Sequence, residues 1–549
     1  MNASRPRCDG AAPATAGAGR SAIAGRLWLL AAGVMAGLEL GRRVLVNNDE
    51  ARFPLLARDI LERGSWLLPN LNGVPYVNKP PLLAWLIALA SLVEGHVTPV
   101  SGALPSALAA VATAAVVHAL GREGFGPRAG RYAALAAIAT AGFVLHARLA
   151  MPDMLLTCAA TAAIWMLWRA LEGRRRAWLG FWGFAAAAFW AKGPPGLLPL
   201  LVAVVVVLAL GRPDRFAVLA PTRGILLWLL AVTPWIALTV AAGPARAAHV
   251  AVDDQFRWYV SGPLHPGRLL DPVRNAAGIL YPWVLVVPIA VVDALAARRR
   301  REGPRAGLVF VLAWGATVIA AVALSNQQRL RYYLPVLPPA ALLVGWWLAR
   351  PAPEARSEPR AFGRPGTLLV ATGAVLALGT ALASRGRPAG APASLAEGVV
   401  AAAAPVAVAA VLLTGRSQAR RRTAFVVAWL VAAAVVLAGY HVEVGRLNAM
   451  SDYPSLPARL APRLAGDVRL GALDVPELPA AFYLGRPVTV LRSPAEVPAF
   501  VTGPPPGIVL VGNRTLPAVP DQDRLALLGA VWLALRPATV IGPNGPPTP

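Results

Sequence analysis

The fold is decided by residues 151–215, MPDMLLTCAATAAIWMLWRALEGRRRAWLGFWGFAAAAFWAKGPPGLLPLLVAVVVVLALGRPDR. Three apolar runs stand in this stretch, at 153–169, 177–191 and 194–210. Each approaches the length of about 20 residues that a helix needs to cross the hydrocarbon core of a bilayer. The arginines gather in the short connections between the runs, where they meet water and lipid headgroups. The stretch therefore predicts membrane-spanning helices.

The same pattern continues on both sides of this stretch and predicts thirteen spans in all. They cover residues 22–41, 103–120, 131–147, 153–169, 177–191, 194–210, 222–241, 278–297, 306–324, 333–349, 366–384, 398–414 and 423–440. The first span follows several arginines, as in a signal peptide, but its length favours an anchor that is retained. A shorter apolar piece, Pro81–Val93, is typical of a helix that lies in the interface.

The composition narrows the class of protein. Of the 549 residues, 57% are hydrophobic and 14% are charged, whereas soluble domains average about 25% charged residues. This balance excludes a soluble enzyme and an intrinsically disordered protein. The two cysteines, Cys8 and Cys158, are too few for a disulfide framework. The expected fold class is an all-α polytopic membrane bundle.

The formal net charge is +25 at pH 7, and the places of the basic residues decide its meaning. Short cytoplasmic loops are enriched in lysine and arginine. If Pro81–Val93 does not cross, all the arginine-rich loops share one side with the N-terminal tail, residues 1–21, which we expect in the cytoplasm. These loops contain Arg122, Arg128, Arg131, Arg169, Arg174, Arg175, Arg176, Arg212, Arg215, Arg223, Arg298, Arg299, Arg300, Arg301, Arg350 and Arg416. The positions of the arginines thus orient the chain in the inner membrane, and no nucleic-acid partner is expected. Arg42 and Arg43 are exceptions to the enrichment of basic residues in cytoplasmic loops, because they follow the first span on its outer side.

The opposite, periplasmic side receives the long parts of the chain that do not cross. Residues 22–440 form the expected transmembrane domain, and its outward loops are 42–102 and 243–277. The C-terminal residues 441–549 are less apolar and are expected to fold as a small α/β domain on the outer face. Their β-type runs are 467–473, 487–491 and 507–511, and their helix-like pieces are 478–484 and 494–500.

The first outward loop opens with paired carboxylates, in Asn47-Asn48-Asp49-Glu50-Ala51-Arg52-Phe53. Asp49 and Glu50 beside a membrane surface offer a general base and a neighbour that orients it. The pattern equally suits a plain helix start, with Asn48 or Asp49 as the cap and Glu50 in the first turn. The helix that follows, residues 52–63, mixes apolar and charged residues like a helix in the interface plane.

Two more polar positions stand at outer helix ends. Lys79 precedes Pro80 and Pro81 at the start of a helix, where its ammonium and nearby backbone N–H groups suit a phosphate. A lysine that reaches toward the headgroups is the alternative. Asp153 follows Pro152 at the start of a span and is either an ordinary cap or a third functional acid.

The remaining outward candidates are cations among aromatic residues. Arg257 lies between Phe256 and Trp258 and suits a phosphate or sugar contact. Arg331 and Tyr332 stand at an outer helix mouth, where an aromatic belt is the alternative. The histidines and aspartates of this loop, His249, Asp253, Asp254 and His265, match no strong ligand spacing, so a divalent metal is weakly supported.

These motifs, in this order, resemble the GT-C superfamily of polyprenyl-phosphate-dependent glycosyltransferases, in particular the branch of the lipid A aminoarabinose transferases and protein O-mannosyltransferases. The residues that carry the resemblance are Asn48 to Arg52, Trp66 to Gly73, Tyr76 to Leu82, Arg148 to Met154, Ala191 to Pro194 and Arg331 to Pro335. The resemblance covers residues 20–350 well, and the last spans and the outer part agree in layout.

The resemblance implies a transferase that moves a sugar from a polyprenyl-phosphate carrier, such as undecaprenyl phosphate, to a lipid A-like glycolipid, a glycan or a protein at the outer face. In that family the first acidic motif supplies the catalytic carboxylate, here Asp49, and the lysine before the paired prolines contacts the donor phosphate, here Lys79. Tyr76, Arg257 and Tyr332 match other donor-contacting positions. Displacement at one carboxylate predicts inversion at the anomeric carbon.

One departure from the family pattern concerns the metal and the sugar. Aminoarabinose transferases have a glutamate before the lysine and an acid-histidine pair in the long loop, where this chain has Asn78 and Asp253-Asp254-Gln255. The departure weakens the expectation of a metal and of aminoarabinose. A transporter of a lipid-linked or small solute is the alternative function, although transporters place their polar residues near the bilayer midplane.

Overall fold

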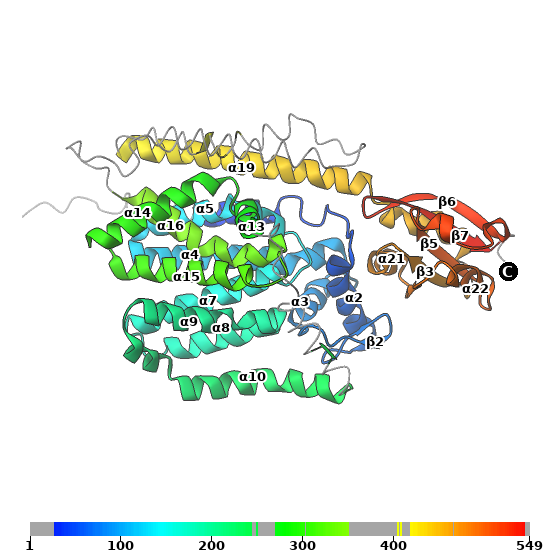
Figure 1. The fold of residues 1–549 in the computed structure, drawn as a ribbon, viewed down its shortest axis with the longest axis horizontal. Helices are drawn as coiled ribbons and strands as arrows, with labels where there is room; N and C mark the ends of the chain where they lie inside the picture. Colours follow the sequence, from blue (N-terminus) through cyan, green and yellow to red (C-terminus); the bar gives the residue numbers. More distant parts are fainter. Residues whose placement is uncertain are drawn as a thin grey trace, which may run out of the picture.

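The computed structural model describes residues 27–243, 249–250, 270–301, 303–350, 403, 405, 407–408, 418–464 and 466–543. In these residues the helices run side by side in a bundle, and a sheet lies beyond one end of the bundle (Figure 1). The predicted span 366–384 lies outside the described residues, as do all but four positions of the predicted span 398–414.

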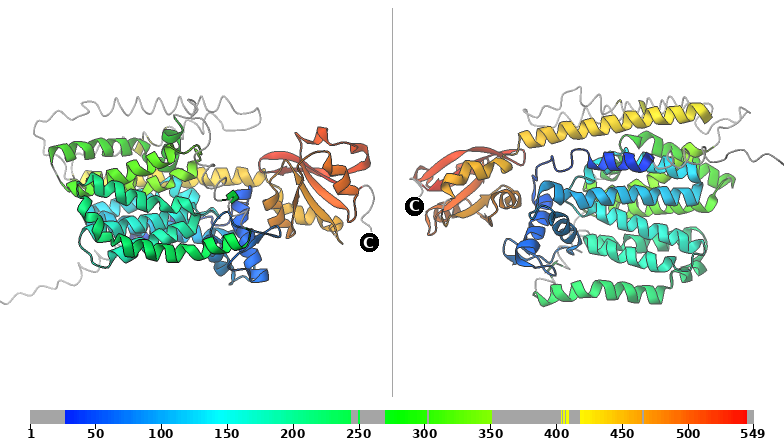
Figure 2. Two further views of the ribbon diagram at one scale, coloured as in Figure 1. Left: turned by 60° about the horizontal axis from the view of Figure 1, so that its bottom comes forward. Right: turned by 180° about the vertical axis from the view of Figure 1, so that it is seen from behind.

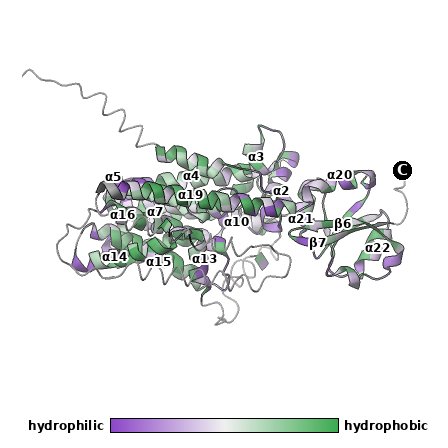
Figure 3. Ribbon diagram, turned by 90° about the horizontal axis from the view of Figure 1, so that it is seen from above, coloured by the Kyte–Doolittle hydropathy of each residue, from purple (hydrophilic) through white to green (hydrophobic). Residues whose placement is uncertain are grey.

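Apolar helices of 6 to 32 residues build the bundle. They are Leu27–Gly37, α4 Pro99–Phe125, α5 Pro127–Ile138, α6 Ala141–His146, α7 Asp153–Leu171, α8 Ala177–Lys192, α9 Leu198–Ala209, α10 Pro221–Ala241, α13 Asp271–Leu280, α14 Val286–Arg300, α15 Arg305–Ala323, α16 Leu337–Ala349 and α19 Gln418–Ala449. Among the described residues, six helices are long and apolar enough to cross a membrane. Figure 3 shows apolar residues along the bundle and hydrophilic ones near its ends. The chain is a multi-pass membrane protein.

Four of the predicted spans are broken, and one of them, 194–210, begins in a 3₁₀ segment, η1 Pro194–Leu197, before α9. The span 131–147 divides into α5 and α6, because Thr140 starts a new helix and its Oγ1 accepts a hydrogen bond from Phe143 N at 3.1 Å. The span 278–297 begins inside α13 and continues as α14 after Pro282, since a helix rarely continues through the residue before a proline. The span 333–349 begins in a 3₁₀ segment, η6 Leu330–Val336, before α16.

Close packing of small residues holds the bundle together. A Cβ added at Gly121 of α4 would lie 2.8 Å from the Cα of Gly130 in α5. These two helices therefore approach backbone to backbone, as small residues allow in membrane bundles. Large side chains fill the interior elsewhere, and Trp283, Trp314 and Phe310 are almost completely buried.

The first outward loop folds over one end of the bundle (Figure 2). It consists of α2 Asn48–Arg63, a hairpin of β1 Asn70–Leu71 and β2 Val74–Pro75, and α3 Leu82–Ser91. At ten residues α3 is about half as long as a bilayer crossing requires. Leu56 and Ile60 of α2 pack with Leu83 and Ile87 of α3 in one buried cluster, so the loop has its own core.

The C-terminal residues form a five-stranded sheet in the order β4-β3-β5-β7-β6. The strands are β3 Arg469–Leu473, β4 Thr489–Val490, β5 Gly507–Gly512, β6 Leu525–Leu533 and β7 Arg536–Pro543, and the helices between them include α21 Glu477–Leu484 and α22 Glu496–Thr502. β3 pairs in parallel with β4 and β5, whereas β7 pairs antiparallel with β5 and β6. The three predicted strands and both predicted helices are present, and the hairpin β6–β7 is additional.

Candidate functional site

The start of α2 sets the direction in which its acids point. The helix begins at Asn48, and Asn47 is the cap: its Oδ1 accepts from Glu50 N at 3.0 Å, and its Nδ2 donates to Glu50 Oε1 at 2.8 Å. The expectation that Asn48 or Asp49 caps this helix is therefore wrong by one or two positions. Because Asn47 satisfies the first turn, the Asp49 carboxylate is available to side chains from other elements.

Three arginines surround the Asp49 carboxylate. Arg331 Nη2 lies 2.7 Å and Arg329 Nη1 3.0 Å from Oδ2, and Arg52 Nη1 lies 3.2 Å from Oδ1. Arg52 is one turn along α2, whereas the other two come from the segment that leads into α16. The Asp49 side chain is 30% exposed, so a substrate can reach this cluster.

The arginines also govern the charge state of Asp49. Burial by itself would raise the pKa of the Asp49 carboxyl, but the guanidinium groups of Arg331, Arg52 and Arg329 outweigh burial and hold this pKa below its ordinary value of 3.8. Nearby positive charges favour the ionised form of an acid. Asp49 is thus a carboxylate at neutral pH, with three positive charges around one negative charge.

A second, deeper ion pair lies beside this cluster. Lys192 Nζ, at the end of α8, lies 2.5 Å from Asp153 Oδ1 at the start of α7, and both side chains are almost completely buried. The N-cap position of α7 is Pro152, which has no side-chain hydrogen-bonding group. The expectation that Asp153 is an ordinary cap is therefore wrong. Lys192 also lies 4.4 Å from the ring centre of Tyr332, which joins the pair to the predicted site.

Removing one member of this pair tests how much the deep network contributes to stability. We expect Lys192→Met to destabilise the protein by about 3–5 kcal/mol, because it leaves the Asp153 carboxylate buried without its partner. Adding Asp153→Leu should recover most of the loss, since two well-packed apolar side chains can replace a buried pair. Thermal unfolding of the purified protein in detergent measures both effects. Equal unfolding temperatures for wild type and Lys192→Met would contradict the pairing.

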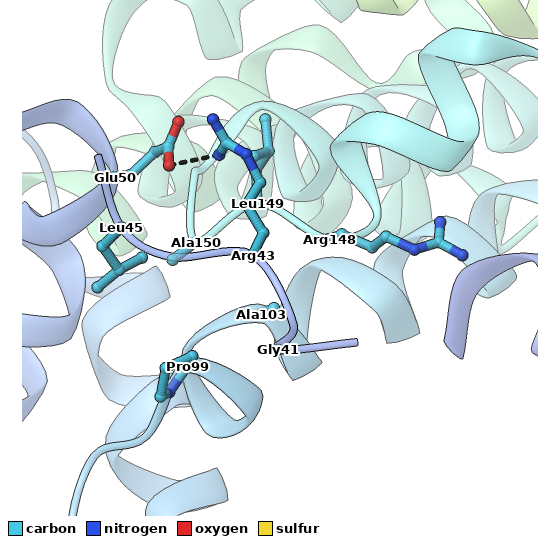
Figure 4. A pocket seen from close by; sticks show the side chains of 9 residues that line it. All are labelled: Gly41, Arg43, Leu45, Glu50, Pro99, Ala103, Arg148, Leu149 and Ala150. Atoms are coloured by element: carbon cyan, nitrogen blue, oxygen red, sulfur yellow. Dashed lines mark hydrogen bonds and ion pairs between the residues drawn. The ribbon is translucent and has the colours of Figure 1, made fainter. Parts of the chain in front are cut away.

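Glu50 points away from the arginine cluster and into the protein. It is 4% exposed and forms an ion pair with Arg43. Figure 4 shows these two side chains facing each other in a small cavity, with Arg148 turned the other way. The cavity volume, about 10 Å³, is near the lower limit for one water molecule. A sugar therefore does not fit against Glu50.

The other predicted donor contacts are Tyr76, Lys79 and Arg257. Arg52 Cζ lies 5.8 Å from the ring centre of Tyr76, so Tyr76 borders the cluster. Lys79 has a partly exposed side chain two residues before Pro81, the residue that precedes α3. Arg257 lies outside the described residues.

The divalent metal stays a prediction from the sequence. Within the residues that the structure describes, no group of three or more His, Cys, Asp or Glu side chains is arranged to hold a metal ion. His249 is described, whereas Asp253, Asp254 and His265 lie outside the described residues.

Sequence reasoning missed three residues of the site. Arg329 stands two positions before Arg331 and was not among the predicted site residues, and Arg52 was assigned to a helix in the interface plane. Lys192 stands in the short motif Ala191 to Pro194, 39 residues from its partner Asp153. The signal for Lys192 is a basic residue inside an apolar run at the same predicted membrane face as Asp153.

A family model described as dolichyl-phosphate-mannose-protein mannosyltransferase matches residues 78–237 of the chain. Two relatives are undecaprenyl phosphate-alpha-4-amino-4-deoxy-L-arabinose arabinosyl transferases. The protein from Pectobacterium carotovorum is 30% identical over 365 residues, which cover 63% of this chain and 62% of that protein. The protein from Pseudomonas fluorescens Pf-5 is 27% identical over 339 residues, which cover 58% of each. The chain thus spans less than two thirds of the length of the relatives it matches.

The fold is that of a solved GT-C protein. The crystal structure of ArnT from Cupriavidus metallidurans bound to undecaprenyl phosphate superposes with a TM-score of 0.75 over 95% of this chain and 98% of that one, at 20% sequence identity. The apo structure of the same protein gives a TM-score of 0.71. In sequence and in fold, the chain resembles the GT-C polyprenyl-phosphate glycosyltransferases.

Proposed function

We propose that the protein is a membrane glycosyltransferase that moves a sugar from a polyprenyl-phosphate carrier to an acceptor. The observation that carries the proposal is the Asp49 carboxylate, partly exposed and held by Arg331, Arg329 and Arg52 at distances of 2.7–3.2 Å. A base and an excess of guanidinium groups in one place are the two things that this transfer needs. The similar proteins named above, whose descriptions mention lipid phosphates, give the donor class.

The reaction follows from the chemistry of the donor. A lipid phosphate is a good leaving group, so the donor needs charge stabilisation more than it needs an acid. The acceptor hydroxyl gives its proton to Asp49, its oxygen attacks the anomeric carbon, and the bond from that carbon to the phosphate oxygen breaks. The polyprenyl phosphate leaves on the opposite face, with inversion at the anomeric carbon.

The arginines link donor binding to the strength of the base. A donor phosphate and the Asp49 carboxylate compete for Arg331 and Arg329, since guanidinium groups bind both kinds of oxygen in the same fork geometry. When the phosphate takes one of them, Asp49 loses a positive neighbour and becomes a stronger base. Lys79, Tyr76, Tyr332 and Arg257 are proposed as further donor contacts around the same mouth.

Glu50 and Asp153 take supporting roles in this proposal. Glu50 pairs with Arg43 beside a cavity of about 10 Å³, which suits a residue that fixes the loop leading into α2. Asp153 pairs with Lys192 and interacts electrostatically with Arg331. The pair thus sets the depth and direction of the Arg331 side chain.

The proposed topology places the site on the outer face of the inner membrane. The N-terminal tail, residues 1–21, is cytoplasmic, residues 22–440 cross the membrane thirteen times, and residues 441–549 are periplasmic. Helix ends support this arrangement: Arg122, Arg169 and Arg350 stand at one end of their helices, as the enrichment of cytoplasmic loops in arginine predicts.

Cysteine labelling tests this topology directly. In a background without Cys8 and Cys158, Val74→Cys should react with a membrane-impermeant maleimide in intact cells, because Val74 is 43% exposed in the outward hairpin. Arg174→Cys should react only after the membrane is opened, because it lies in the loop after α7. Labelling of both positions in intact cells would contradict the topology.

The proposal is tested by offering the purified protein a panel of donors. Wild type in nanodiscs is mixed with polyprenyl-phosphate hexoses, pentoses and aminopentoses together with lipid A, glycan or peptide acceptors. Mass spectrometry then follows the release of polyprenyl phosphate. A transferase breaks the bond between sugar and phosphate, whereas a transporter moves its solute intact. If no member of the panel is cleaved, the proposed function is wrong.

The position of the site also favours a transferase over a transporter. Asp153 begins α7, Lys192 ends α8 and Arg331 precedes α16. These residues stand at helix ends, whereas transporters bind their substrates near the bilayer midplane.

A further inference from the structure

In the described residues, the short helix α21 of the C-terminal part packs against α2, the helix that carries Asp49. We propose that α21 fixes the N-terminus of α2, so that Asn48 and Glu477 are positioning residues for the Asp49 carboxylate. This inference rests on the proposed role of Asp49. It assigns the C-terminal part a share in the reaction that does not depend on its binding any substrate.

Asn48 joins the two helices with both ends of its carboxamide. Its Nδ2 donates to Glu477 Oε2 at 2.7 Å, and its Oδ1 accepts from Leu478 N at 3.1 Å. The N-cap position of α21 is Pro476, which has no side-chain acceptor for the first N–H groups. Asn48 therefore caps α21 from 430 positions away, and it does so as the residue immediately before Asp49.

Arg58 of α2 holds the other end of α21. Its Nη2 donates to Phe482 O at 2.8 Å and its Nη1 to Ala481 O at 3.4 Å, and its Cζ lies 4.7 Å from the Phe482 ring centre. These carbonyls belong to the last turn of α21, where intrahelical donors run out. Side chains of α2 thus form hydrogen bonds with both ends of the short helix α21.

Apolar packing and a third hydrogen bond complete the contact. Leu478 and Phe482 of α21 are buried in the same cluster as Leu56 of α2. Tyr483 Oη accepts from Leu45 N at 3.0 Å, just before α2 begins. The backbone on both sides of Asn47 is therefore tied to α21. Since a misplacement of about 1 Å can cost up to ~100-fold in rate, this contact determines how well Asp49 reaches the acceptor.

The experiment compares two asparagines of the same interface. Asn48→Ala removes the contact beside Asp49. Asn72→Gly removes the bond from Asn72 Nδ2 to Val488 O, 3.4 Å long, at the hairpin; glycine suits the positive φ of 52° there. We expect kcat to fall about 10- to 100-fold in Asn48→Ala with an unchanged KM for the donor, and to stay within about twofold of wild type in Asn72→Gly. Equal kcat values for the two variants would overturn the proposal.

An exchange of groups distinguishes positioning from simple loss of fold. Asn48→Asp sets a carboxylate against that of Glu477 and should lower kcat about as much as Asn48→Ala. Adding Glu477→Gln gives back a donor and an acceptor with the same total charge, so we expect kcat to return to within about threefold of wild type. A double variant no faster than Asn48→Asp would contradict the inference.

A readout without donor separates this inference from the proposed function. Hydrogen exchange of the amides at the start of α2, measured by mass spectrometry, should become faster in Asn48→Ala and stay as in wild type in Asn72→Gly. If wild type cleaves no lipid-phosphate sugar but this pattern of exchange is found, the proposed function is wrong, and the inference that α21 fixes the N-terminus of α2 is supported. If hydrogen exchange at the start of α2 is the same in Asn48→Ala as in wild type, the inference that α21 fixes this end of α2 is wrong, whatever the activity of the variant.

Discussion

Arg331→Gln is expected to lower kcat/KM for a polyprenyl-phosphate sugar by about 10²–10³ at neutral pH, the usual loss when one preorganised donor to a developing charge is removed. Arg331 Nη2 makes the shortest contact to the Asp49 carboxylate, 2.7 Å. Its side chain is largely buried, at 22% exposure, so water replaces it poorly. Initial rates of polyprenyl phosphate release at several donor concentrations measure this loss in kcat/KM.

The same variant should change the dependence on pH in a defined direction. Burial raises the pKa of Asp49, and the positive charge of Arg331 is the largest of the effects that lower it. Without that charge the pKa of Asp49 rises. A base must be deprotonated to act. In wild type, activity is therefore lost only as the pH falls below 3.8, the ordinary pKa of an aspartate, because the pKa of Asp49 lies below that value. In Arg331→Gln we expect the loss to begin at a higher pH than in wild type. An acidic limb that stays in place would contradict the role given to Arg331.

The matched control is the other end of the same helix. Arg350 follows α16 and pairs with Asp293 at 3.3 Å, which is the same kind of contact on the opposite side of the bundle. We expect Arg350→Gln to leave both kcat/KM and the acidic limb unchanged. A loss equal to that in Arg331→Gln would mean that an arginine beyond either end of α16 has this effect.

The apolar runs predicted most of the helices but not their interruptions. The spans 103–120 and 153–169 correspond to α4 and α7, because a run of apolar residues in a membrane has one stable backbone structure. The breaks at Thr140 and Pro282 depend on a local cap and on a proline. The hydropathy of the sequence does not indicate either of these breaks.

The acids and Arg331 of the candidate site were predicted from the sequence, whereas Arg329, Arg52, Lys192 and all of the ion pairs were not. Asp49 was recognised from its motif, but its three arginine partners include two from the segment before α16, about 280 positions away. No local rule joins segments so far apart. Arg43, which contradicts the charge rule, has its explanation in the structure: its partner is the buried Glu50.

In the C-terminal part too, the sequence predicted some strands and missed others. The strands β3 and β5 are buried apolar runs with turn residues around them, which is a strong strand signal. The edge strand β6 reads Leu-Ala-Leu-Leu-Gly-Ala-Val-Trp-Leu, whose burial does not alternate regularly and includes a register shift at Leu527 to Gly529. A bulge of this kind hides the period of two.

Asp49→Asn is expected to have the largest effect of all. Asparagine is nearly the same size and keeps an acceptor for the arginines, so the fold should be retained. It cannot take a proton from the acceptor hydroxyl, and loss of a general base costs about 10²–10⁴ in rate. Binding of the donor should be as tight as in wild type or tighter, since the carboxylate no longer competes with the phosphate for Arg331 and Arg329.

The central claim is that Asp49 is the base in transfer from a lipid phosphate, and the turnover of one active donor tests it most directly. Polyprenyl phosphate release is measured for wild type, Asp49→Asn and Asp293→Asn in nanodiscs under saturating donor and acceptor. Asp293→Asn makes the same chemical change in an ion pair outside the site, the pair with Arg350. We predict a rate at least about 100-fold lower for Asp49→Asn and a wild-type rate for Asp293→Asn. Release by Asp49→Asn as fast as by wild type would contradict the account.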